Sequence, residues 1–111
     1  MNRLKRQHDF DFVFSKGKRS FAKSLCMVLA KRQTGEETLL GVSVSKKHGK
    51  AVERNKIKRL LRAVYYPLIP RIKKGYLIVF VPKVGYCHSF ESFRRDINYL
   101  LNKESMFGDV E

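Results

Sequence analysis

The stretch TLLGVSVSKKHGKAVERNKIKRLLRAVYYP, residues 38–67, combines the signals of a strand, a basic connection and a two-faced helix. In its first part apolar and small residues alternate, with Leu40, Val42 and Val44 on one face and Gly41, Ser43 and Ser45 on the other. This alternation predicts a strand over residues 38–45. We expect its apolar face to pack on a core and its nearly bare face to be approached by something large.

The second part of the stretch predicts an amphipathic helix over residues 51–66, which ends before Pro67 and Pro70. At about 100° per residue, the polar arc of this helix contains Arg54, Asn55, Lys58, Arg59 and Arg62. The opposite, apolar arc contains Val52, Ile57, Leu60, Leu61, Ala63 and Val64, with Glu53 and Lys56 intruding on it. Glu53 falls in the first turn, where the helix dipole favours its negative charge.

Eight Lys and Arg residues but one acid lie between Lys46 and Arg62. A face that meets only solvent would normally interleave acids, because like charges at i, i+4 are destabilising by roughly a few tenths of a kcal/mol per pair. Carboxylates elsewhere in the fold are an alternative partner for these cations. A mixed array suits an RNA backbone, since Arg pairs bidentately with phosphate and Lys adds a mobile charge. Asn55 would either fix the helix start or read a ribose hydroxyl.

The whole chain repeats this excess, with 24 Lys and Arg against 10 Asp and Glu and a net charge of +14. Such a field favours a polyanionic partner, and nucleic acid is the first candidate. A membrane surface is the competing polyanion, but the sequence has neither an apolar run of about 18 residues nor a signal peptide. We therefore expect a cytoplasmic protein that binds no membrane, and no protein partner is implied.

Residues 9–16 predict a short helix that Asp9 caps and that Gly17 ends in the left-handed conformation. Phe10, Val13 and Phe14 share one face of this helix, at i, i+3 and i+4. The spacing is typical of a core-facing stripe, yet it also places two aromatic rings side by side.

The remaining pattern predicts two strands and one more helix. A mostly apolar run predicts a strand from Ser20 to Arg32, and QTGEET, residues 33–38, predicts a hairpin loop to the next strand. YLIVFV, residues 76–81, predicts a buried strand. Residues 89–103 predict a helix that Ser89 caps, and its apolar side contains Phe90, Phe93, Ile97, Leu100 and Leu101.

The predicted order is helix, strand, strand, helix, strand, helix, which indicates an α+β fold in a single domain of residues 1–111. We expect a mixed sheet of about four strands with the helices packed on one face. The apolar fraction of 43%, with 8 Phe and 5 Tyr, supplies enough material for a core without disulfides or a structural metal.

No group of residues predicts catalysis or a metal site on the protein. Cys26 and Cys87 lie far apart and read as buried or inert thiols, and His8, His48 and His88 read as solvated loop residues. A nuclease that acts alone would need clustered carboxylates for its metal ions. The acids are instead scattered over different elements, as seven of the ten show: Asp9, Asp11, Glu36, Glu37, Glu53, Glu91 and Asp96.

Two segments, SVSKKHGKAVERNKIKRLLRAVY (residues 43–65) and RLKRQHDFDFVFSKGKRSF (residues 3–21), together resemble the protein subunits of bacterial ribonuclease P. The family signature is an Arg-Asn-Arg or Arg-Asn-Lys step followed by Lys-Arg and a further Arg, here Arg54, Asn55, Lys56, Lys58, Arg59 and Arg62. The resemblance covers nearly the whole chain. It implies a fold shared with domain IV of elongation factor G and a small-subunit ribosomal protein domain. It also implies a left-handed βαβ crossover around the basic helix, where a right-handed one is usual.

The resemblance further implies that the protein binds a large catalytic RNA, and that the complex removes the 5′ leader of precursor tRNA by endonucleolytic cleavage. The RNA would carry the chemistry with magnesium ions, so the protein alone would be inactive. The implied RNA-binding residues are Lys46, Lys47, Lys50, Arg54, Asn55, Lys56, Lys58, Arg59 and Arg62. Phe10 and Phe14 would line a cleft that holds the leader, with Val28 where some members carry an aromatic ring; the alternative is that both rings are core.

A ribosomal-type structural RNA-binding protein without a processing role is the alternative function. It would share the charge and the fold, so composition does not exclude it. The feature that discriminates between the two is the joint presence of the aromatic first helix and the Arg-Asn-Lys helix.

Overall fold

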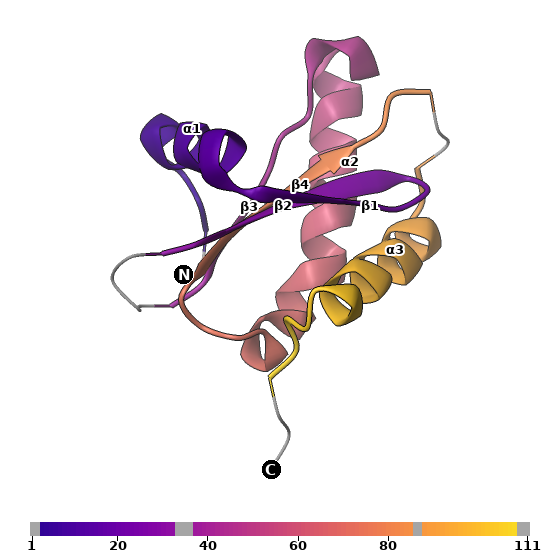
Figure 1. Cartoon of the computed structure of the whole chain (residues 1–111). Helices are drawn as coiled ribbons and strands as arrows, with labels where there is room; N and C mark the ends of the chain where they lie inside the picture. Colours follow the sequence, from indigo (N-terminus) through magenta and orange to yellow (C-terminus); the bar gives the residue numbers. More distant parts are fainter. Residues whose placement is uncertain (1–2, 33–36, 86–87, 109–111) are drawn as a thin grey trace.

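The structure, a computed structural model, describes residues 3–32, 37–85 and 88–108 and organises them around a four-stranded mixed sheet (Figure 1). The helices are α1 (Gln7–Lys16), α2 (Ala51–Tyr65) and α3 (Phe90–Lys103), with the 3-10 helices η1 (Lys46–His48) and η2 (Tyr66–Arg71) before and after α2. The strands are β1 (Lys18–Phe21), β2 (Leu25–Lys31), β3 (Leu39–Val42) and β4 (Tyr76–Pro82). The predicted α+β fold class is confirmed.

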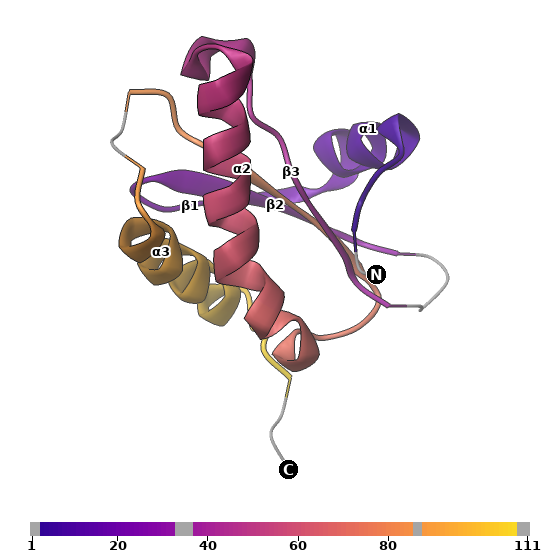
Figure 2. The same ribbon diagram turned by 180° about the vertical axis from the view of Figure 1, so that it is seen from behind.

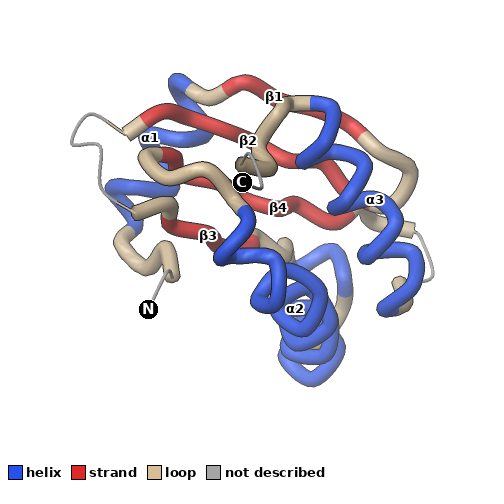
Figure 3. Tube along the Cα trace, turned by 90° about the horizontal axis from the view of Figure 1, so that it is seen from below, coloured by secondary structure: helices blue, strands red, loops and turns tan. Residues whose placement is uncertain are grey.

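The strands lie in the order β1-β2-β4-β3, so β4 separates β2 from β3 (Figure 3). The predicted hairpin between these two strands is therefore wrong; residues 33–36 of the connecting loop lie outside the described residues. β4 takes a central position because its seven residues are largely buried on both faces and pair on both sides. The shorter β3 lies at the edge.

β3 and β4 are parallel neighbours joined through α2, which makes the βαβ unit that the resemblance implies. Figure 2 shows α2 lying across the strands on the same side of the sheet as α3. The left hand of the crossover stays a prediction.

The predicted strand from Ser20 to Arg32 is in fact two strands, β1 and β2, which pair antiparallel. Their connection is tight: the Ala22 N–H donates to the Leu25 carbonyl at 2.9 Å. The buried carboxylate of Asp96, on α3, accepts hydrogen bonds from both the backbone N–H and the hydroxyl of Ser24. The spacing of apolar residues did not predict the turn between β1 and β2, because the hydrogen bond that stabilises this turn comes from a residue 72 positions away.

Helices cover both faces of the sheet (Figure 1). On one face α2 and α3 build the larger core, which includes Leu25, Met27, Leu40, Leu61, Ile78, Phe80, Phe93 and Ile97. On the other face α1 builds a smaller core, which includes Leu4, Val13, Val28, Ala30, Leu77 and Val79. The prediction that all helices pack on one face is wrong, because β2 and β4 are apolar in both directions and each face must be shielded from water.

The ends of the helices agree in part with the predictions. Ser89 caps α3 as predicted, since its hydroxyl accepts the Ser92 N–H at 3.1 Å. α1 begins earlier than expected, with Arg6 rather than Asp9 at the N-cap. Gly17 follows α1 with φ −79°, so the predicted left-handed conformation is wrong. Glycine is needed there because an added Cβ would lie 2.4 Å from the Val13 carbonyl oxygen and 2.9 Å from Cγ1 of Val28.

The apolar arc of α2 is narrower than predicted. Ile57, Leu61 and Val64 are buried, whereas Val52 is 72% exposed and Ala63 is also exposed. On α3 the same difference affects Phe90, which is exposed, while the other predicted apolar residues are buried. Each helix contacts the sheet along a single stripe, so apolar residues at the margins of the arc stay in solvent.

We expect Asp96→Asn to lower the free energy of unfolding at neutral pH by about 1.5–3 kcal/mol, the contribution of hydrogen bonds to a charged group. Burial acts to raise the pKa of Asp96, but hydrogen bonds from Arg95 and Ser24 outweigh it and hold the pKa below its ordinary value. The ionised carboxylate therefore stabilises the fold above about pH 4, and this contribution is lost as the pH falls below that value.

Denaturant unfolding of Asp96→Asn and the wild type between neutral and acid pH measures this difference. The gap in unfolding free energy between the two proteins should narrow as the pH falls. A gap that stays constant with pH would show that the charge of Asp96 does not stabilise the fold.

Candidate nucleic-acid interface

The nine predicted RNA-binding residues lie on α2 and on the segment that leads into it. Lys46, Lys47 and Lys50 are exposed at the amino-terminal end of α2, and Asn55, Lys56 and Arg59 are exposed along the helix. Arg54, Lys58 and Arg62 are half-buried and flank the stripe that packs on the sheet. We call these nine residues the basic face. Lys56 lies on the outer side of α2, away from the flank formed by Arg54, Lys58 and Arg62.

None of the cations of the basic face forms an ion pair with a carboxylate within residues 3–32, 37–85 and 88–108. The ion pairs found there are Arg6–Asp9, Lys18–Glu104, Arg94–Glu91 and Arg95–Asp96. Glu53, the acid of α2, accepts the backbone N–H of Lys50 at 2.9 Å and so caps the helix. The positive charge of the basic face is thus left open to an external anion.

Two arginines of the basic face have an N–H group that is shielded from solvent. The Nε atoms of Arg54 and Arg62 are buried and have no hydrogen-bond partner among the described residues. A buried N–H without an acceptor is unfavourable by about 1–3 kcal/mol. Because both Nε atoms are shielded, an oxygen ligand on this flank of α2 would remove that penalty only after the side chains turn toward it.

Histidines hold the segment before α2 against the rest of the fold. Nε2 of His48 lies 3.1 Å from the Pro82 carbonyl oxygen, and its ring lies 5.5 Å from that of His88, which stacks on Phe93 at 5.0 Å. The prediction that His48 and His88 are solvated loop residues is wrong, although His8 is exposed. Burial, and then the neighbouring His48, lower the pKa of His88, so the His88 imidazole is neutral and packs as an aromatic ring.

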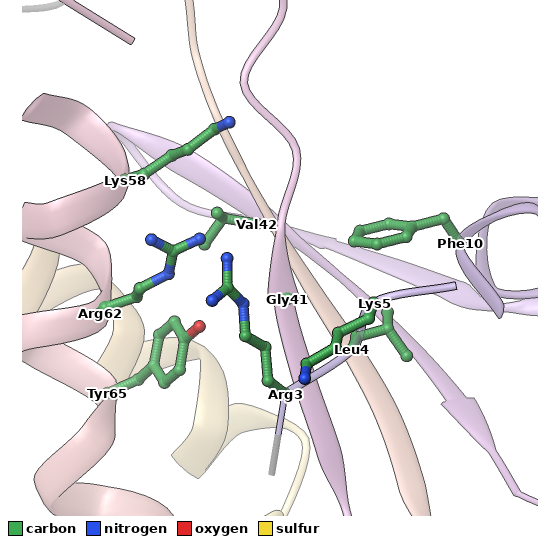
Figure 4. A pocket seen from close by; sticks show the side chains of 9 residues that line it. All are labelled: Arg3, Leu4, Lys5, Phe10, Gly41, Val42, Lys58, Arg62 and Tyr65. Atoms are coloured by element: carbon green, nitrogen blue, oxygen red, sulfur yellow. The ribbon is translucent and has the colours of Figure 1, made fainter. Parts of the chain in front are cut away.

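A pocket of about 470 Å³ opens between α2 and the amino-terminal segment (Figure 4). We call it the α1–α2 pocket. Its lining residues are Arg3, Leu4, Lys5, Phe10, Gly41, Val42, Lys58, Arg62 and Tyr65. Lys58 and Arg62 enter from α2, while Arg3 and Lys5 enter from the segment before α1. Four cations from two separate elements therefore line one hollow, and the guanidinium groups of Arg3 and Arg62 point toward each other in it, which suits a phosphate group.

Backbone pairing places the amino-terminal cations. The Leu4 N–H donates to the Leu40 carbonyl at 2.9 Å, so the segment runs beside the free edge of β3. Leu4 is buried, while Arg3 and Lys5 on either side of it are exposed. Neither cation was predicted from the sequence. The alternation of Arg, Leu and Lys is the signal that indicates an extended segment there.

Tyr65 closes the inner end of the α1–α2 pocket and was also missed. Its ring is buried and lies 5.5 Å from that of Phe80. Burial, and then the neighbouring Tyr66, raise the pKa of Tyr65, although the charges of Arg62 and Arg3 and a hydrogen bond from Arg62 oppose the rise. The hydroxyl therefore stays protonated and helps to orient Arg62.

The bare face of β3 is filled by the chain itself. A Cβ added to Gly41 would lie 2.9 Å from the Leu4 Cβ and 2.9 Å from the Phe10 Cζ. The large neighbour expected at this face is therefore, in part, the ring of Phe10.

Phe10 and Phe14 lie on the same side of α1 but reach opposite edges of the sheet. Phe10 contacts Gly41 on β3, whereas the ring of Phe14 lies 5.6 Å from the guanidinium carbon of Arg19, on β1. Both rings pack on the smaller core and remain partly exposed. Val28 is fully buried beneath Gly17, so no nucleotide can contact it in this conformation.

Beyond α1, the same face of the sheet stays open towards the end of β1. Strand pairing sets Phe21, Cys26 and Val81 in one row across β1, β2 and β4, with Arg19 beside it. We call these four residues the open sheet end. Burial raises the pKa of the Cys26 thiol more than the nearby charges of Arg19 and Lys83 lower it. Cys26 is thus a free, buried thiol as predicted, and Cys87 lies outside the described residues.

The described part of the chain offers no cluster for a metal ion, since no three His, Cys, Asp or Glu side chains gather there. A magnesium ion, which prefers several oxygen ligands, does not fit this arrangement. Nor does any described helix combine the length and apolar character needed to span a bilayer.

Comparison with known proteins places this arrangement in a family. Residues 1–105 match the family model described as Ribonuclease P. The chain is 33% identical to the ribonuclease P protein component of Bacillus velezensis, over 96% of this chain and 91% of that protein. It is 40% identical to the corresponding protein of Clostridioides difficile, over 74% of this chain and 72% of that protein.

Solved structures show the same fold. The structure of the RNase P protein from Staphylococcus aureus matches with a TM-score of 0.85 at 25% identity, over 97% of this chain and 99% of that one. The RNase P protein from Thermotoga maritima matches with a TM-score of 0.80 at 29% identity, over 93% of this chain and 97% of that one. The likeness extends over the sheet and the helices that form the basic face and the α1–α2 pocket.

Proposed function

The chain belongs to the ribonuclease P protein family, and we propose that it is the protein subunit of a ribonuclease P ribonucleoprotein. In this complex it binds the catalytic RNA and the 5′ leader of precursor tRNA and assists endonucleolytic removal of the leader. The RNA carries the chemistry, and the protein alone is inactive. Magnesium is bound mainly by the RNA of the complex.

The observation that carries this proposal is the basic face, which no carboxylate of the described chain neutralises. A phosphate backbone lying along α2 would meet Arg54, Lys58 and Arg62 in turn, at a spacing of one helical turn each. The α1–α2 pocket extends this positive surface across the edge of β3 to Arg3 and Lys5. The catalytic RNA is the proposed occupant of this surface.

The leader is proposed to lie along α1, where Phe14 and Arg19 present an aromatic ring and a guanidinium group together. Stacking of a base on a ring contributes roughly 1–3 kcal/mol, so even one exposed ring is enough to hold a single strand. Val28 is buried and leaves this set, while the open sheet end adds Arg19, which the sequence analysis did not include.

Reconstitution tests the proposal directly. The purified protein, added to its cognate catalytic RNA at modest magnesium concentration, should raise the rate of cleavage of precursor tRNA above that of the RNA alone. The protein without RNA should leave the precursor intact. Absence of any enhancement with correctly folded protein would favour the alternative function, a ribosomal-type structural RNA-binding protein.

A further inference from the structure

A second hollow lies at the β1 edge of the sheet, and we call it the α3 pocket. Its volume is about 520 Å³, and its lining residues are Phe21, Ala22, Lys23, Lys83, Arg95, Asp96 and Tyr99. They come from the end of β1, the β1–β2 turn, the residue that follows β4, and α3. β1 and β3 are the two edge strands, so the α3 pocket and the α1–α2 pocket lie at opposite edges of the sheet. The basic face contributes nothing to the α3 pocket.

The α3 pocket presents aromatic surface that the core does not use. Tyr99 is 53% exposed and Phe21 is 58% exposed. The neighbouring Ile97, Leu100 and Leu101 of α3 are fully buried and already provide its contact with the sheet. Exposed rings of this kind offer flat faces on which unpaired bases stack.

The pocket is also positively charged. Lys23, Lys83 and Arg95 line it, and Nζ of Lys103 lies 5.9 Å from the centre of the Tyr99 ring. Asp96 is the carboxylate in the lining, but it is buried and accepts hydrogen bonds from Ser24 and Arg95. Asp96 also neutralises Arg95 in an ion pair at 3.0 Å, so the charge that an incoming molecule meets comes mainly from Lys23 and Lys83.

We propose that the α3 pocket binds single-stranded RNA. Phosphates would pair with Lys23 and Lys83, since Arg95 is already paired with Asp96, and a base would stack on Tyr99. A second copy of this chain is a poor occupant because it brings the same excess of positive charge, +14. An acidic protein would pair with the two lysines but would leave the flat aromatic surface without a matching group.

We assign to the α3 pocket the part of the leader that is farthest from the cleavage site. This assignment rests on the proposed function. The open sheet end joins the two regions: Arg19 contacts Phe14 on one side, while Phe21 belongs to both the open sheet end and the α3 pocket. Lys83 stands beside Cys26 and also lines the pocket. A strand that leaves Phe14 along β1 therefore passes Arg19 and Phe21 and reaches the pocket that contains Tyr99.

The test measures the binding of two precursor tRNAs to the reconstituted holoenzyme. Their leaders are about 4 and about 16 nucleotides long, which brackets the usual size of single-strand sites. The wild-type complex should bind the long-leader precursor more tightly. Tyr99→Ala should weaken binding of the long-leader precursor by about tenfold, the loss of one stacked base, and leave the short-leader precursor unaffected. Tyr99→Phe keeps the ring and should behave as the wild type, and so should Tyr66→Ala, which removes an exposed tyrosine elsewhere.

Equal losses for both leaders, or no loss for either, would overturn the proposal. Binding of labelled oligouridylate to the free protein separates this result from a failure of the proposed function. If the holoenzyme does not process precursor tRNA, weaker binding of the oligonucleotide by Tyr99→Ala still supports an RNA site in the pocket, and unchanged binding overturns it. Polyglutamate that competes as well as oligouridylate would also overturn the assignment to RNA.

Discussion

Replacing Arg54, Lys58 and Arg62 together by glutamine is expected to weaken binding of the cognate catalytic RNA by about 10³-fold. The three side chains form the half-buried flank of the basic face, and each is expected to contribute one charge-assisted hydrogen bond to a phosphate. Because all three side chains are half-buried, their interactions with phosphate should be stronger than those of fully exposed lysines. Filter binding or fluorescence titration over a range of salt concentrations measures the effect.

The salt dependence makes this result specific. With about 6–10 phosphates neutralised, the affinity of the wild-type protein should fall by roughly 10³–10⁵ between about 50 and 200 mM salt, somewhat less if single strands dominate. The triple variant should show a shallower slope, by about one unit for each phosphate that the protein no longer neutralises.

A matched control separates the position of the charges from their number. Lys31, Lys73 and Lys74 are exposed and lie off the basic face, so their joint replacement by glutamine lowers the net charge equally. This control should lose much less affinity than the variant of the basic face. Equal losses in the two variants would show that only the total charge matters, and the basic face would then have no special role.

Replacing Phe14 by Ala should weaken binding of leader-bearing precursor tRNA to the holoenzyme by about tenfold or more, with little effect on mature tRNA. The ring of Phe14 lies between the smaller core and solvent and is covered in part by Arg19, so it offers one face to an incoming base. Binding of the two RNAs to the same reconstituted complex measures the difference.

Phe14→Leu distinguishes stacking from packing. Leu fills the site against the smaller core but offers no aromatic face, so it should preserve the unfolding free energy better than Ala. If the ring stacks on the leader, both variants lose the preference for precursor tRNA. If the ring serves only the core, Phe14→Leu should bind precursor tRNA as the wild type does, and losses in Phe14→Ala should be equal for precursor and mature tRNA.

Local sequence patterns correctly predicted much of this fold. The apolar spacing and the Ser89 cap of α3, the buried run of β4 and the end of α2 before its prolines all follow from short-range preferences of the backbone. The charge of the basic face was also readable, because the helical period of the cations is a property of the sequence alone. These features agree with the structure because nothing distant competes with them.

The errors share one cause, which is packing between distant segments. The hairpin between residues 20–32 and 38–45 was wrong because β4, far along the chain, inserts between the two strands. The β1–β2 turn was missed because Asp96 holds it, and Gly17 ends α1 because of the close approach of Val28 rather than through a left-handed turn. Packing of this kind depends on the shapes of segments that are far apart in the sequence, and the periodicity of neighbouring residues carries no information about it.

The same division applies to the site. The residues of the basic face from Arg54 to Arg62 were predicted because they follow one another along a single helix, so helical geometry alone aligns them. Lys46, Lys47 and Lys50 precede this helix and were predicted from the family resemblance. Arg3 and Lys5 join Lys58 and Arg62 in one pocket only because backbone pairing lays the first residues against the edge of β3. Tyr99 and Lys23 likewise meet only where the β1–β2 turn contacts α3. The spacing of charges along a helix is a property of the sequence. A pocket forms only in the folded protein, because its lining residues come from segments that are distant in the sequence.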